Sequence, residues 1–72
     1  MSAAESSEGD GEALAALNRA FVCALLALGD AGEADQACRL AASAWSALRH
    51  QHPREANRLN GVMHSLTQRR PT

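Results

Sequence analysis

Large apolar residues recur in the first half of the chain at spacings that place them on one side of a helix. The spacings are three, four, four and three residues, and a helix with 3.6 residues per turn brings such positions into one stripe. Asp10 fits an N-cap before the stripe, and Gly29 fits a left-handed residue after it. We therefore predict a helix over residues 11–28, with a buried stripe formed by Leu14, Leu17, Phe21, Leu25 and Leu28.

The rest of this helix divides into apolar and polar positions. Val22 and Leu26 widen the apolar stripe, so the helix is expected to have more than one neighbour. Asn18 and Arg19 lie off the stripe and are expected to face solvent.

A second apolar stripe, built mostly from alanine, predicts a helix over residues 31–50. Asp30 and Glu33 have the spacing of a capping box at its start, and Gly32 is an alternative cap. The turn is so short that this helix must fold back antiparallel on the first. Its inner face consists of Ala34, Ala37, Cys38, Ala41, Trp45 and Leu48.

In a symmetric hairpin, residues whose numbers sum to about 61 lie at the same level. Leu17 is then level with Ala44, and Leu14 with Ala47. Because leucine meets alanine, we expect the two axes to approach to the near end of the 8 to 10 Å range. Little volume should remain for a pocket.

Pro53 begins a third predicted helix, over residues 53–67, because proline suits the first helical position. Its stripe consists of Ala56, Leu59, Val62, Met63 and Leu66. Gly61 in its interior either permits a close approach or is only tolerated.

Together these patterns predict an all-α fold, an antiparallel three-helix bundle. The 46% apolar content is mostly alanine and leucine, which favour helix over strand. Residues 10–68 form the single predicted domain. Residues 1–9 are small, polar and acidic without apolar periodicity, which predicts a disordered tail, and residues 69–72 should fray.

The predicted hairpin resembles a tetratricopeptide repeat over about residues 18–46. The matching residues are Leu28-Gly29-Asp30-x-x-Glu33-Ala34 at the turn, Ala41 in the second helix, and Phe21 and Leu25 in the first. Val22 replaces a small residue of that family, and Ser46 replaces a proline. The resemblance implies a TPR-like helical hairpin and a protein-binding role, but a single repeat cannot form the family's stacked groove.

Charge is divided unevenly along the chain. Up to Cys38, seven acidic residues and one arginine give −6, whereas from Arg39 onward six arginines and one acidic residue give +5. Lysine is absent, which with abundant alanine and arginine is typical of a GC-rich, bacterial coding sequence. A polyanion could contact Arg54, Arg58, Arg69 and Arg70, so weak nucleic-acid binding is the alternative function.

Catalysis and metal binding lack their usual motifs. The acidic residues sit at predicted helix starts, where capping accounts for them, so we expect no enzyme activity and no cofactor. His50, His52 and His64 form no metal-ligand spacing, and Cys23 and Cys38 are expected to be reduced thiols. The acidic start and short apolar runs predict no signal peptide or membrane segment and a cytoplasmic location.

Partner binding is the function that remains. We expect a small interaction module, acting as an adaptor, a chaperone-like subunit or a self-associating protein, with a helix face as its binding surface. Its contact residues are predicted to be Val22, Leu26, Leu40 and Met63. If the third helix covers this apolar surface fully, the bundle is inert instead.

Overall fold

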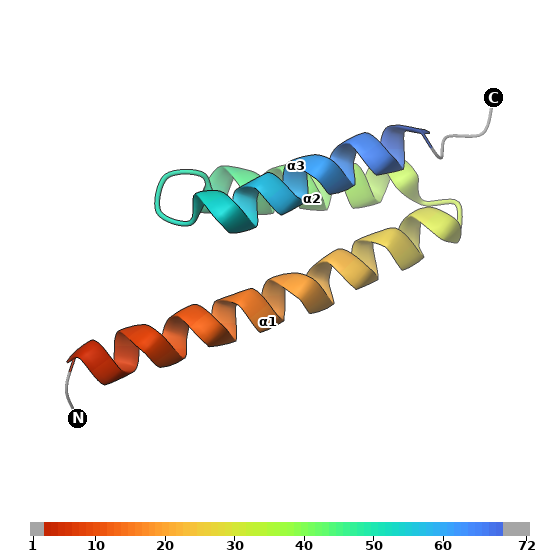
Figure 1. The fold of residues 1–72 in the computed structure, drawn as a ribbon. Helices are drawn as coiled ribbons and strands as arrows, with labels where there is room; N and C mark the ends of the chain where they lie inside the picture. The colour runs from red at the N-terminus through yellow and green to blue at the C-terminus, as the bar shows by residue number, and fades with distance from the viewer. Residues whose placement is uncertain (1–2, 69–72) are drawn as a thin grey trace.

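The computed structural model describes residues 3–68, with side chains from Gly11 onward. It contains three helices, α1 (Ala3–Asp30), α2 (Ala34–Leu48) and α3 (Pro53–Gln68). All three pack against one another, and the described residues contain no strand. The predicted all-α three-helix bundle is therefore confirmed (Figure 1). The predicted frayed end at 69–72 lies outside the described residues.

Helix α1 begins earlier than the pattern predicts. It spans 28 residues from Ala3, so 3–9 are helical where the sequence predicts a disordered tail, and Asp10 lies inside the helix instead of capping it. Extending a formed helix adds one hydrogen bond per residue, so propagation costs much less than nucleation. As a result, α1 projects beyond the loop between α2 and α3 (Figure 1).

A Schellman motif ends α1. The Glu33 N–H donates to the Leu28 carbonyl and the Gly32 N–H donates to the Gly29 carbonyl, both at 3.0 Å. Gly32 has a φ of 93°, so it is the left-handed residue that the sequence assigned to Gly29. Helix α2 then starts at Ala34 after Glu33, which makes no side-chain cap bond.

Gly29 has a different role inside α1. It is buried, and a Cβ atom built on it would lie 2.5 Å from Cδ2 of Leu66. The missing side chain therefore lets the end of α1 approach α3 closely.

Helix α2 ends at Leu48, two residues before the predicted end. Arg49 is its C-cap and its backbone N–H donates to the Trp45 carbonyl, while its guanidinium carbon lies 5.1 Å from the centroid of the Trp45 ring. This stacking covers the half-buried ring on its outer side. Pro53 begins α3, as predicted, and the His52 carbonyl accepts the first backbone bond, from Ala56.

The core lies where all three helices meet. Its buried members are Leu25, Ala37, Ala41, Leu59, Val62 and Leu66. The alanines of α2 are thus covered by bulky residues of α1 and α3, as the alanine stripe predicts. Gly61 faces open space, with nothing within 4 Å of a Cβ built on it, so it is tolerated and permits no close approach.

Candidate interaction groove

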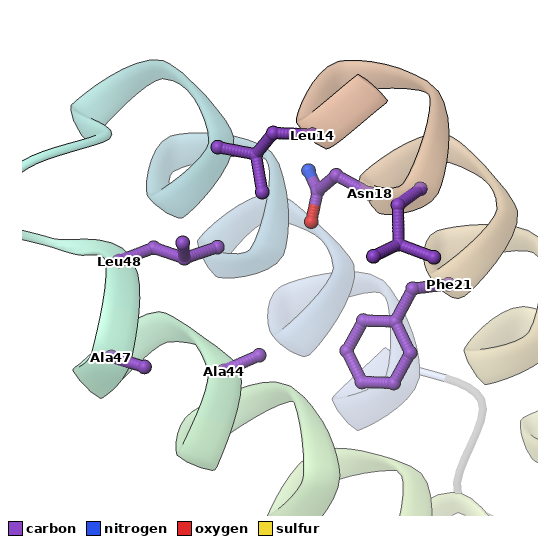
Figure 2. Close-up of a pocket in the computed structure, with 7 residues that line it drawn as sticks. Leu14, Asn18, Phe21, Ala44, Ala47 and Leu48 are labelled. Atoms are coloured by element: carbon purple, nitrogen blue, oxygen red, sulfur yellow. The ribbon is translucent and has the colours of Figure 1, made fainter. Parts of the chain in front are cut away.

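An apolar groove of about 350 Å³ lies between α1 and α2 (Figure 2). We call it the α1–α2 groove. It is lined by Leu14, Leu17, Asn18 and Phe21 of α1 and by Ala44, Ala47 and Leu48 of α2. Figure 2 shows Leu14 and Phe21 on one wall, facing Ala44, Ala47 and Leu48 on the other.

The groove bears on the predicted pairing and tightness of the hairpin. Leu14 and Leu17 line the same hollow as Ala44 and Ala47, so the residues predicted to pair lie near one another. The expectation of little pocket volume is wrong, because the short alanine side chains do not reach across to α1 at this end of the bundle. The gap between the helices is left as an open apolar surface.

Leu17 is the most exposed large apolar residue of the described part. Its side chain is 67% exposed, so its predicted place in the core is wrong. It lies about 80° around α1 from the buried Leu25, on the open side of the helix. It therefore stands at the rim of the α1–α2 groove with little cover from its own chain.

Asn18 takes the inward position instead. Its side chain is only 5% exposed, and its amide nitrogen donates to the Glu55 carbonyl at 3.4 Å. The predicted solvent exposure of Asn18 is therefore wrong. The bond joins α1 to the first turn of α3 and holds a polar group beside an apolar groove.

Removing this amide should cost a modest amount of stability. Asn18→Ala is expected to lower the free energy of unfolding by about 1 kcal/mol, the usual net contribution of one hydrogen bond. Urea unfolding followed by circular dichroism measures it, with the same change at an exposed asparagine of α3, Asn57→Ala, as the control. Equal effects of the two changes would contradict the anchoring role.

The four predicted partner-binding residues do not gather on one surface. Val22 and Leu26 lie one turn apart on α1 and pack, half-buried, against the core, as does Met63 on α3. Leu40 is 40% exposed. It lies four residues before Ala44 on α2, so it extends the rim of the α1–α2 groove by one turn. Val22, Leu26, Leu40 and Met63 are not among the residues that line the groove, whereas Leu14, Leu17 and Phe21, which the sequence analysis assigned to the buried stripe, do line it.

Of the four arginines predicted to contact a polyanion, two lie within the described residues. Arg54 and Arg58 line a second hollow of about 270 Å³ together with Glu55, Asn18, Ala15 and Gly11. Arg69 and Arg70 lie outside the described residues. Glu55 lies between the two arginines in sequence and also lines their hollow, so residues of both charges line this surface.

Helix α1 is apolar beyond what its burial requires. Its segment Gly11–Asp30 is long and apolar enough to cross a membrane, by length and composition, a property that the short apolar runs of the sequence did not indicate. A core helix that meets this criterion is normally mostly buried, but only 11% of the apolar window is buried here. Much of the apolar surface of α1 is therefore uncovered.

The candidate metal ligands and the two cysteines are the remaining groups that could carry chemistry. Across residues 11–68, no three His, Cys, Asp or Glu residues are grouped so that they could hold a metal ion. Cys23 is exposed, Cys38 is half-buried, and both are free thiols.

Comparison of the chain with protein-family models, with curated proteins and with solved structures finds no match. The similarity of residues 18–46 to a tetratricopeptide hairpin thus stays a resemblance. The surfaces of the bundle itself are what indicate a function.

Proposed function

We propose that this protein is a non-catalytic helical module that binds a partner helix through the α1–α2 groove. The observation that carries the proposal is an open, almost wholly apolar hollow with the exposed Leu17 at its rim. Apolar grooves between helices accept the apolar face of another helix, whose side chains fill them. A small-molecule site usually offers several placed polar groups, whereas the one polar side chain lining this groove, Asn18, already donates to the Glu55 carbonyl.

The mixed charge of the second hollow makes polyanion binding the weaker alternative. Arg54 and Arg58 share it with Glu55, and a nearby carboxylate repels phosphate. Retention on a heparin column that falls steeply with salt would favour this alternative over the groove.

An apolar dye tests whether the groove is accessible. Nile red, which is neutral, should fluoresce on binding wild-type protein at low micromolar concentration. Ala47→Leu places a larger side chain in the groove and should reduce this fluorescence several-fold. Ala42→Leu is the matched control, because Ala42 is an exposed alanine of α2 outside the groove.

Equal dye binding by the two variants would show that the groove is not the apolar site. Absence of dye binding by the folded wild-type protein at every concentration would count against the proposed function itself.

A further inference from the structure

The outer face of α1 carries apolar surface that the rest of the bundle does not cover. Its exposed positions are almost all small and uncharged, namely Ala13, Ala16, Ala20, Cys23, Ala24 and Ala27. Between Gly11 and Asp30, the charged residues of α1 are limited to Glu12, Arg19 and Asp30. A solvent-facing helix side normally carries more charge than this.

The same helix is longer than its own bundle can cover. The Asn18 amide already reaches the first turn of α3, so the part of α1 before Gly11 projects past the other helices (Figure 1). With 28 residues, α1 is about 42 Å long. A second helix could therefore pack along it over many turns.

We propose that the helix that binds this surface is α1 of a second copy of the chain, packed antiparallel to the first. This inference goes beyond the proposed function, because the outer face of α1 meets the α1–α2 groove only at Leu17. The surface is suited to two-fold pairing because it holds both a protruding side chain, Leu17, and a hollow beside it. A two-fold interface requires such self-complementarity.

Charge complementarity sets the direction and register. Glu12 and Arg19 are seven residues apart, which is about two turns, so they lie on the same flank of α1. In an antiparallel pair in which residue numbers sum to 31, Glu12 of each copy lies opposite Arg19 of the other. A parallel pair in register would instead place like charges together, which is unfavourable.

This register also covers the exposed leucine. Leu17 comes level with Leu14 of the second copy, a residue that lines the groove. The two copies of Leu17 are then about one turn apart on the flank opposite the charge pairs, at the mouths of the two grooves. The alanines between the flanks allow the axes to approach closely.

A membrane is the less favoured cover for α1. Asn18 and Arg19 lie near the middle of the apolar window, and an arginine at the centre of a bilayer is costly. Insertion would also remove Leu25 from the core and break the bond between Asn18 and Glu55.

Sedimentation equilibrium tests the pairing. The apparent mass should rise with concentration from 7.6 kDa toward twice that value. Leu17→Glu places a charge at the centre of the pair and should weaken association at least roughly tenfold. Ala42→Glu, an equally exposed change on α2, should leave association unchanged.

A charge exchange tests the register. Glu12→Arg and Arg19→Glu should each weaken the dimer severalfold, and the double variant should restore it. A structural role for either residue in the monomer would not produce this rescue.

Disulfide formation adds a second test of the register. Ala16 lies next to the two-fold axis, so Ala16→Cys in a Cys23→Ser, Cys38→Ala background should form a dimer on mild oxidation. The native Cys23 of the two copies would be about 22 Å apart along the helices, beyond the reach of a disulfide. Efficient cross-linking through Cys23 and none through position 16 would refute the antiparallel register.

The outcomes separate this inference from the proposed function. A monomer at all concentrations that still binds Nile red in the α1–α2 groove would overturn the dimer and leave the groove intact. Binding to phosphatidylglycerol vesicles by a protein that stays monomeric would overturn the dimer in favour of a membrane.

Discussion

Leu59→Ala is expected to lower the free energy of unfolding by about 2 to 5 kcal/mol, the largest effect of any change considered for this protein. Leu59 is fully buried in the core where α3 meets the alanines of α2. A domain of 72 residues has a total stability of roughly 4 to 11 kcal/mol. Urea unfolding, followed by circular dichroism and by the fluorescence of Trp45, measures the loss at a concentration that keeps the chain monomeric.

Leu17→Ala provides the matched control for this substitution. Leu17 is on the open side of α1, so its truncation should change the free energy of unfolding of the monomer by no more than about 0.5 kcal/mol. If Leu59→Ala prevents folding, Leu59→Met keeps most of the volume and should cost less than about 1.5 kcal/mol. A large loss with Leu17→Ala and a small one with Leu59→Ala would contradict the packing of α1.

The contrast between Leu17 and Asn18 shows where periodicity fails. The stripe from Leu14 to Leu28 follows helical spacing, and Leu25, Phe21 and Leu28 do contact or form the core. However, α1 packs against both α2 and α3, and the side of α1 that faces the space between them carries Leu25 and Asn18. These two residues are only about 20° apart around the helix. Leu17 falls outside that side. The spacing of apolar residues alone cannot reveal which side of α1 faces the core, because that side depends on where α3 lies.

The candidate groove was equally hard to predict. The pairs predicted for the hairpin supply four of the residues that line the groove. Whether leucine facing alanine produces close packing or a gap depends on how the helix axes diverge. The spacing of apolar residues along the chain does not give this divergence. The close contact at Gly29 is a second packing feature that the pattern did not reveal, because the sequence indicated a turn residue there.

Gly29→Ala is expected to lower the free energy of unfolding by about 1 to 3 kcal/mol, because an extra methyl group overpacks the junction of α1 and α3. The new Cβ would lie 2.5 Å from Cδ2 of Leu66, which is shorter than any normal carbon contact. Leu66 is itself fully buried, so it can yield only by leaving its preferred rotamer or by pushing α1 away. The midpoint of urea unfolding should therefore fall.

Gly61→Ala is the matched control, since it makes the same change in a helix interior where a Cβ would meet nothing. There alanine should raise the free energy of unfolding by about 0.5 to 1 kcal/mol, because glycine loses more backbone entropy on folding. Gly29 also lies within a helix, so the same propensity gain applies to it and the difference between the two variants isolates the clash with Leu66. If both substitutions stabilise the protein equally, α1 and α3 are not in close contact at Gly29.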